Sequence, residues 1–217
     1  MLHITNGESV SIPHTGLPGQ VVYWNDILHD GPVPGGLPLQ ELSRIRERFI
    51  ADFFAVPLSE VSFAGRDEAI AHFRDHEEVI LWFEHDLFDQ LQLIQILDWF
   101  SHQVLAPTRL SLISVNSHLG PMTPEQLVPL FETRHTVTAA EFNAAQAAWT
   151  AFCAPEPAGL TELLGSDTSS LPFLRRALLR HLQQLHLLGG VHLLGGVHLY
   201  EGFPIWRWDE ATQTVRS

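Results

Sequence analysis

The sequence predicts an α/β protein whose core is an open, mostly parallel, Rossmann-like sheet. Short apolar runs alternate with helical patterns along the first 120 residues, and this alternation is typical of parallel α/β sheets. The apolar runs are continuous, as expected for strands that are buried on both faces. Several runs end on polar side chains, at the position where ligands bind in open parallel sheets.

Four apolar segments are predicted to be strands of one sheet. The first ends at Asn6-Gly7, which predicts a tight loop, and a loop rich in glycine and proline at residues 31–38 follows the second. The four predicted strands are residues 2–5, 21–24, 79–83 and 110–115.

Three helices are predicted among these strands. Residues 39–54 place Leu42, Ile45 and Phe49 on one face, with the spacing of an amphipathic helix. Residues 66–76 form a second predicted helix, and residues 87–100 form a third, directly after the third strand.

After Thr123 the pattern becomes mostly helical. Residues 124–154 are predicted to form one helix, which the stretch "APEPAG" interrupts. Ser169 or Ser170 is available to cap a further helix at residues 171–185.

The end of the chain contains a repeat and a predicted terminal β-hairpin. The hexapeptide "HLLGGV" occurs twice in succession, and we interpret it as short strands that turn at Gly-Gly. A metal site formed by His186, His192 and His198 is an alternative, since a period of six places them on one side of an extended chain. The chain is therefore divided into an α/β domain (1–120), a mostly helical part (121–185) and a Gly-rich repeat with a β-hairpin (186–217).

Composition favours a folded protein that does not bind nucleic acid. Hydrophobic residues make up 45% of the 217 residues, which is sufficient for a large core. The 25 acidic and 12 basic side chains give a net charge of −13, and such a surface repels phosphate backbones. A single cysteine, Cys153, excludes an intramolecular disulfide and favours a reducing compartment.

The N-terminal stretch "MLHITNGES" lacks a basic segment followed by a long apolar segment, so we expect no signal peptide. No run of 18 apolar residues is present, so we expect no membrane span. The expected location is the cytoplasm.

The polar side chains that follow the four strands are the candidate site. If the strands are parallel, these side chains meet at one edge of the sheet. They are Asn6 and Gly7 after the first strand, Asp26, His29 and Asp30 after the second, Glu84, His85, Asp86 and Asp89 after the third, and Asn116 and His118 after the fourth.

A site of carboxylates and imidazoles suits a divalent metal ion or general acid/base catalysis. The metal, if any, is not identified by the sequence. A nucleotide-phosphate cradle is not indicated, because GxGxxG is absent and the chain contains no lysine. The candidate catalytic residues are Glu84, His85, Asp86 and His29, and the candidate substrate-binding residues are Asn6, Gly7, Asp26, Asp89 and Asn116.

A purely structural role explains part of the same pattern. Asp86 is placed to cap the third helix, and Asp89 lies at the third helical position, where a carboxylate favours the helix dipole. Glu84 and His85 precede that cap and are surface residues in this interpretation. His29 is equally consistent with a loop histidine bonded to the backbone.

Three stretches resemble the bacterial family called domain of unknown function 1835. They are "LHITNGESV", "VVYWNDILHDGPVP" and "VILWFEHDLFDQLQLIQILDWF". The first is similar to the family's H-x-x-N-G-D-S segment, with Glu8 in place of the usual Asp. The other two are similar to its W-x-x-x-L-H-x-G-P-V and W-F-E-H-D-L-x-D-Q-L segments. "FLRRALLRHLQQL" and "GGVHLYEGFPIWRWDE" resemble later parts of longer members, which have an additional segment between them.

This resemblance covers about residues 1–120 and implies a set of motif positions, but no activity, because the family is uncharacterised. The motif positions it implies are His3, Asn6, Gly7, Asp26, His29, Gly31, Pro32, Glu84, His85, Asp86, Asp89 and Gln90.

Two functions remain open from the sequence. One is an enzyme, a hydrolase or transferase that acts on a small phosphorylated or nucleotide-like substrate. The other is a non-catalytic module that binds a small molecule in the same cleft and regulates a partner. The oligomeric state is not predicted.

Overall fold

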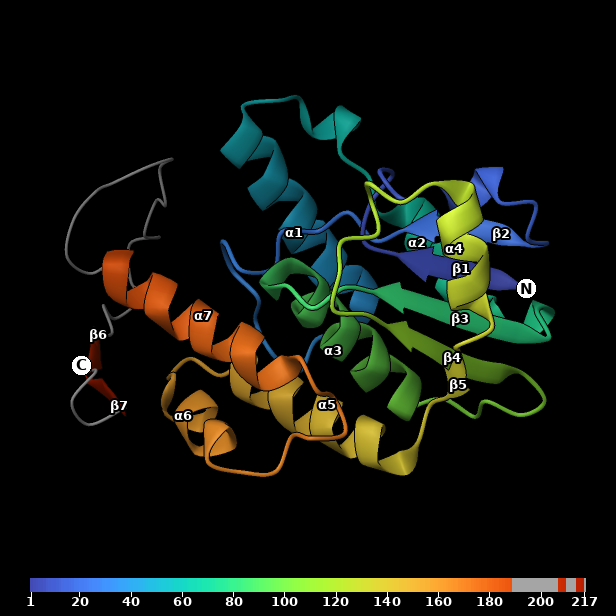
Figure 1. Ribbon diagram of the computed structural model, residues 1–217. Coiled ribbons are helices and arrows are strands. Elements are labelled where there is room, and N and C mark those ends of the chain that lie inside the picture. Colours follow the sequence, from blue (N-terminus) through green and yellow to red (C-terminus); the bar gives the residue numbers. More distant parts are fainter. Residues whose placement is uncertain (189–206, 210–213, 217) are drawn as a thin grey trace.

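The computed structural model describes residues 1–188, Arg207–Asp209 and Thr214–Arg216 (Figure 1). Its main element is a five-stranded open sheet in the order β2-β1-β3-β4-β5. The strands are β1 (Leu2–Thr5), β2 (Gln20–Tyr23), β3 (Glu78–Phe83), β4 (Arg109–Ser114) and β5 (His135–Thr136).

The four predicted strands are confirmed, and all four are parallel members of one sheet. Their bounds differ from the prediction by at most one residue at each end. The short edge strand β5 was not predicted, and it pairs antiparallel with β4. From β1 the chain first continues to β2, on one side of β1, and then crosses to β3, on the other side. The direction in which strands are added therefore reverses between β1 and β3.

The helices in the described part of the chain follow the predicted order in the first half. They are α1 (Leu39–Phe54), α2 (Ala64–Ala71), α3 (Leu87–Ser101), α4 (Pro124–Phe131), α5 (Ala139–Phe152), α6 (Ala158–Leu164) and α7 (Leu174–Leu188). The helix predicted at residues 66–76 is shorter, because a separate 3-10 turn at Phe73–Asp75 replaces its end. None of these helices is long and apolar enough to cross a lipid bilayer.

The single helix predicted at residues 124–154 is wrong. Thr123 and Thr138 each begin a helix through a capping box, in which the threonine and a residue three positions later satisfy each other's backbone groups. The chain between these helices forms a turn and β5. The helix α6 was not predicted, and α7 begins three residues later than expected. The first helical bond of α7 joins Ala177 N to the carbonyl oxygen of Phe173, so the predicted capping by Ser169 or Ser170 is also wrong.

The tail is described only in part. The strands β6 (Arg207–Asp209) and β7 (Thr214–Arg216) pair antiparallel, but the residues between them lie outside the described part, so the terminal hairpin stays a prediction. The first residues of the hexapeptide repeat continue α7 as far as Leu188. The rest of the repeat, with the alternative histidine metal site, lies outside the described residues.

Side chains of the central strands alternate between two apolar layers. Leu2, Leu81 and Leu112 belong to a large hydrophobic cluster shared with α1, α2, α3, α5, α6 and α7. Ile80 and Trp82 point to the opposite face, where a smaller cluster includes residues of α4. The larger cluster contains side chains from both the predicted α/β domain and the predicted helical part; the boundary between them stays a prediction.

A buried ion pair fixes the loop that follows β2. Arg46 of α1 donates to the carboxylate of Asp26, with an Nη2–Oδ1 distance of 2.8 Å, and neither side chain is exposed. The same guanidinium donates to the carbonyl oxygens of Ile27, Asp30 and Pro32. The guanidinium thus donates to five acceptor atoms, which the compact ammonium group of a lysine could not do, because it has only three donors.

Removal of this guanidinium should strongly destabilise the fold. We expect Arg46→Met to lower the free energy of unfolding by about 3–5 kcal/mol, because it leaves the carboxylate of Asp26 buried without its main partner. The control is Arg48→Met on the exposed face of the same helix, which should change stability by less than about 0.5 kcal/mol. Urea unfolding of both variants measures the difference, and equal stabilities would contradict the prediction.

Candidate functional site

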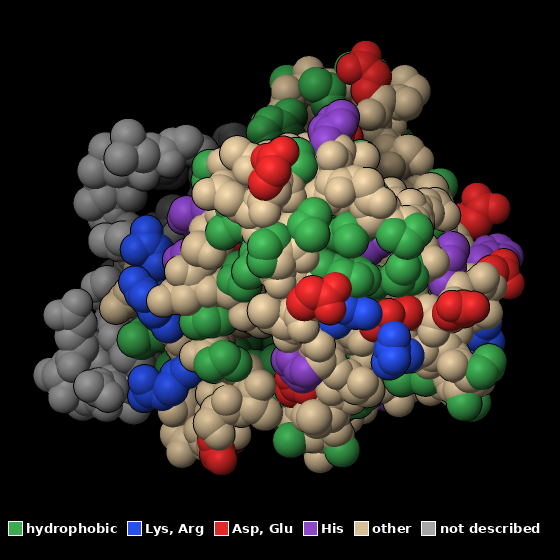
Figure 2. All heavy atoms as spheres, turned by 45° about the vertical axis from the view of Figure 1, so that its right-hand side comes forward, with side chains coloured by type: hydrophobic (Ala, Val, Ile, Leu, Met, Phe, Trp, Pro, Cys, Tyr) green, Lys and Arg blue, Asp and Glu red, His purple; other side chains and the backbone are tan. Residues whose placement is uncertain are grey.

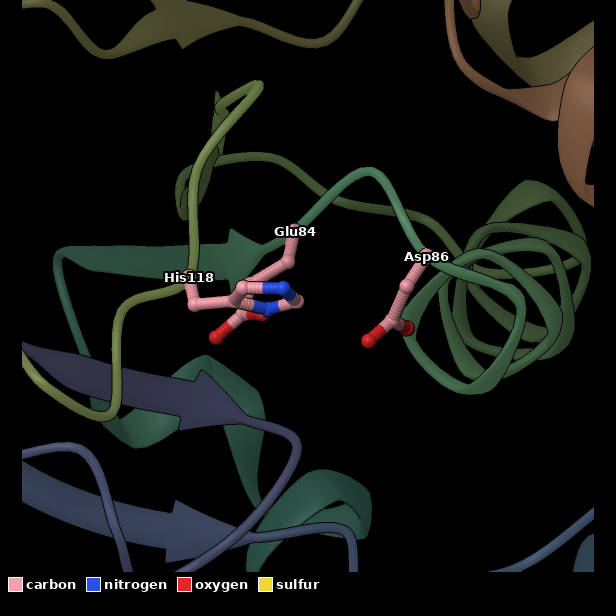
Figure 3. Close-up of side chains that lie close together, drawn as sticks. All are labelled: Glu84, Asp86 and His118. Carbon is pink, nitrogen blue, oxygen red and sulfur yellow. The ribbon is translucent and has the colours of Figure 1, made fainter.

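Three side chains converge at the carboxyl edge of the sheet. Glu84 follows β3, Asp86 precedes α3, and His118 lies in the loop after β4 (Figure 3). One ligand atom from each lies within 4.8 Å of the others. Glu84 is only 9% exposed, whereas His118 is exposed. The group is therefore buried on the side of Glu84 and open to solvent on the side of His118.

The tight connection from β3 to α3 sets the positions of two of these side chains. Asp86 is the N-cap of α3, and its Oδ1 accepts a hydrogen bond from Asp89 N at 3.0 Å. The Asp89 carboxylate in turn accepts from Glu84 N at 2.7 Å. Gln90 donates to the carbonyl oxygen of Glu84 at 2.6 Å. The backbone of Glu84 is therefore held from two sides before its carboxylate contacts anything.

The Glu84 carboxylate joins β3 to the loop after β4. Its Oε1 accepts from Leu119 N, and its Oε2 pairs with His118 Nδ1, both at 2.6 Å. The hydrogen bond and the charge of Glu84 raise the pKa of His118. A carboxylate on one imidazole nitrogen orients the ring and leaves the other nitrogen available for a ligand.

A second polar group lies between the ends of β1 and β3. Asn6 donates to Asp89 Oδ2 at 2.5 Å, and Gln92 of α3 donates both to Asn6 Oδ1 and to the carbonyl oxygen of Asp26. Burial raises the pKa of Asp89 to about 7, and the charges of Asp86 and Glu84 add to this, although the hydrogen bonds from Glu84 N and Asn6 oppose it. Asp89 is thus a buried carboxyl group that changes protonation near neutral pH.

His85 lies beside this group. Its ring centroid is 5.1 Å from that of His118 and 6.2 Å from that of Phe173, which directly precedes α7. Its Nδ1 is buried and has no hydrogen-bond partner within the described part of the chain. This nitrogen is therefore a polar atom whose hydrogen-bonding capacity is not used within the described part of the chain.

His29 belongs to a different cluster. Its Nε2 is 3.1 Å from Asp30, and its ring packs edge-on against Phe88 of α3 at 4.1 Å. His181 of α7, which packs on Phe152, completes the cluster. Burial, together with the charge of His29, lowers the pKa of His181 to about 4, against the opposing charge of Asp30. His181 is consequently neutral at physiological pH.

The remaining candidate residues, Asp26, Gly7 and Asn116, also follow strands at the carboxyl edge of the sheet, but their contacts differ. The Asp26 carboxylate is directed at Arg46, and Gly7 packs against the Asn25 side chain, where an added Cβ would lie 3.3 Å from its Oδ1. Asn116 is exposed in the loop after β4. The structure brings together Glu84 and Asp86, and it adds His118.

Two contributors were not among the selected site residues. His118 was visible in the sequence as a polar residue after the fourth strand, together with Asn116, but only Asn116 was selected as a site residue. Gln92 bridges β1 and β2 from α3, and its position one helical turn after Asp89 was the only signal in the sequence.

The geometry supports metal binding more directly than nucleophilic catalysis. Carboxylate oxygens and an imidazole nitrogen are the ligands of many divalent sites. Burial raises the pKa of the Cys153 thiol to about 12, and a protonated thiol is a poor nucleophile.

His181 should make the protein sensitive to acid. Because its folded-state pKa lies below its ordinary value of 6.5, the unfolded state binds the proton first and stability falls as the pH drops from about 6.5 to 4. We expect His181→Leu to reduce this acid-dependent fall in the free energy of unfolding by on the order of 2–3 kcal/mol. Urea unfolding at pH 7 and pH 4.5 measures it, with exposed His14→Leu as the control. Parallel pH profiles for the parent and His181→Leu would refute the assignment.

Comparisons with protein-family models, with curated proteins and with solved structures found no match to this chain. Its resemblance to the uncharacterised bacterial family stays an expectation from the sequence.

Proposed function

We propose that this protein is a metal-dependent hydrolase or transferase that acts on a small phosphorylated or nucleotide-like substrate. The observation that carries this proposal is the convergence of Glu84, Asp86 and His118, with ligand atoms within 4.8 Å, at the carboxyl edge of a parallel sheet. Open α/β sheets bind their ligands at this edge.

In this proposal Glu84, Asp86 and His118 hold one divalent cation. The cation neutralises charge on a phosphoryl group and activates water or another oxygen nucleophile. His85, with its unpartnered Nδ1, transfers a proton beside the metal. Asn6 and Asp89 fix the end of β1 against α3 and line the neighbouring side of the site.

The mixture of ligands favours Zn²⁺ or Mn²⁺. An imidazole nitrogen is preferred by zinc and other transition metals, and carboxylates are also good ligands for zinc and manganese. His118 binds a metal only as the neutral imidazole, so cation and proton compete for it. Because Glu84 raises the pKa of His118, metal affinity should increase with pH over a range that lies higher than for a histidine without such a partner.

A non-catalytic ligand-binding module is the second candidate. The observation in its favour is that Glu84 and Asp86 already have structural roles, one in holding the loop after β4 and the other in capping α3. In this alternative, a cation and its ligand would bind at the same place without a reaction. Binding alone would then affect the helices that cover the sheet.

The three ligands can be tested by thermal unfolding with and without added metal. A cation that binds only the folded protein raises the melting temperature. We expect Zn²⁺ or Mn²⁺ to stabilise the parent but not Glu84→Gln, Asp86→Asn or His118→Gln. In the absence of metal, Asp86→Asn should remain within about 1 kcal/mol of the parent, because asparagine caps a helix about as well as aspartate.

The matched control is His135→Gln. His135 is exposed and pairs with Glu141 at 2.7 Å, as His118 pairs with Glu84, but it lies outside the candidate site. This variant should respond to metal like the parent. Retention of the metal response by all three ligand variants would exclude the site.

A phosphate-release assay distinguishes the enzyme hypothesis from the binding-module hypothesis. The metal-loaded parent should hydrolyse at least one member of a panel of small phosphomonoesters and nucleotides, and we expect His85→Gln to lower the turnover by about 10²-fold or more while metal binding is retained. Metal binding without turnover of any member would favour the module.

A further inference from the structure

We propose that α7 is an acid-released cover of the carboxyl edge of the sheet: protonation of His181 detaches the helix, and its detachment removes Phe173 from His85. The proposal concerns how α7 is attached, and it holds whether or not the edge binds a metal. It rests on the composition of the buried side of α7 and on buried imidazoles without partners where α7 meets the edge.

One stripe of side chains attaches α7 to the rest of the protein. Its buried positions recur with the period of a helix that has one apolar side; they are Leu174, Ala177, Leu178, His181 and Leu182. Within the described part of the chain, the side chains of α7 make one hydrogen bond to another element, from Arg175 to the carbonyl oxygen of Leu164. Figure 2 shows arginines gathered at the left of the molecule, the side on which α7 lies; blue marks arginine alone, since the chain has no lysine. The attachment of α7 therefore depends on the buried stripe.

His181 is the titratable member of this stripe. It is 8% exposed, and its ring centroid lies 5.1 Å from that of Phe152 of α5. Its Nδ1 is buried and has no hydrogen-bond partner in the described part of the chain. A neutral imidazole can occupy such a position, but a charged one loses its hydration without gaining a partner.

The charged groups that act on His181 belong to the loop after β2. The charge of His29 opposes protonation of His181, and that of Asp30 favours it. No group of α3, α5 or α6 contributes a charge within the described residues. The Asp30 carboxylate already pairs with His29 Nε2 at 3.1 Å, and His29 Nδ1 is itself buried and unpartnered. A proton on His181 is therefore poorly compensated as long as α7 stays attached.

The start of α7 connects this position to the candidate site. Phe173 directly precedes α7, and Ala177 N donates to its carbonyl oxygen, so the first helical turn begins at Phe173. The ring centroid of Phe173 is 6.2 Å from that of His85, whose Nδ1 is also buried without a partner in the described part of the chain. In Figure 1, α7 runs from the carboxyl ends of the strands towards the left of the molecule. Detachment of the helix therefore exposes His85 to solvent.

Proton linkage gives the direction and the size of the effect. In the attached helix, burial and the charge of His29 lower the pKa of His181 to about 4, against the opposing charge of Asp30, whereas a released helix returns it to the ordinary value of 6.5. The released state binds the proton first, so acid favours release. These pKa values raise the equilibrium constant for release about 20-fold between pH 7 and pH 5.

The test is hydrogen exchange of single amides, followed by NMR in the full chain at pH 7 and pH 5 and corrected for the intrinsic exchange rate. Ala177 N reports on the first turn of α7, Leu182 N on the turn after His181, and Leu81 N on β3. We expect the protection of both α7 amides to fall about 20-fold between pH 7 and pH 5. At pH 5 both should remain at least about tenfold less protected than Leu81 N, because α7 opens while the sheet stays folded.

Two variants remove the proton acceptor. His181→Leu extends the apolar stripe, and His181→Gln keeps a polar side chain that takes up no proton, so the second decides if the first packs differently. In both variants the protection of Ala177 N and Leu182 N should change by less than about threefold between the two pH values. The control is His14→Leu, which replaces an exposed histidine and should match the parent.

Three results would overturn the proposal. The first is an equal loss of protection in the parent and in both His181 variants. The second is equal protection of the α7 amides and Leu81 N at pH 5, because the helix would then open only when the whole protein unfolds. The third is a loss at Leu182 N while Ala177 N stays protected, since release would then not reach the turn that covers His85.

Discussion

The turn from β3 to α3 is the constraint on which the candidate site depends. Asp86 accepts from Asp89 N, and Asp89 accepts from Glu84 N, so two carboxylates close a turn of six residues. Without these bonds, the first amide groups of α3 and the amide of Glu84 would be left unsatisfied next to a buried strand. Because both bonds use carboxylates, the turn also concentrates negative charge at one edge of the sheet.

Other parts of the protein attach to this turn. Asn6 connects it to β1, Gln92 extends the connection to the loop after β2, and the Glu84 carboxylate reaches the loop after β4. The loop after β2 is secured separately by Arg46 and Asp26. Four strand ends are therefore fixed relative to one another by polar side chains, in a region where the apolar core no longer determines the structure.

The sequence predicted the sheet well because its signal was local. Continuous apolar runs such as Val79–Phe83 have few alternatives to a buried parallel strand, and Asp86 is recognisable as an N-cap. Prediction failed where tertiary pairing decided the outcome. The two residues of β5 have no strand pattern of their own and are extended because β4 offers an edge. The break before α5 was signalled by Thr138 and Glu141, but the aromatic side chains on either side of it suggested one continuous helix. At the site, Glu84 and Asp86 were found from their place after a strand, whereas the choice between Asn116 and His118 depended on the path of a loop.

The hydrogen bonds of the candidate ligands also restrict their denticity. Asp86 Oδ1 is engaged by Asp89 N, and both oxygens of Glu84 already have partners, one of them the orienting imidazole. In the proposed metal site Asp86 would offer its Oδ2, whereas a cation could use an oxygen of Glu84 only by sharing it with the amide of Leu119 or the imidazole of His118. Bidentate binding by either carboxylate would compete with the helix cap or the loop. Calcium sites commonly rely on a bidentate carboxylate and many oxygen ligands, whereas zinc is satisfied by four ligands in a tetrahedron. If the proposed metal site is occupied, the same bonds that shape the turn would therefore favour a metal of low coordination number.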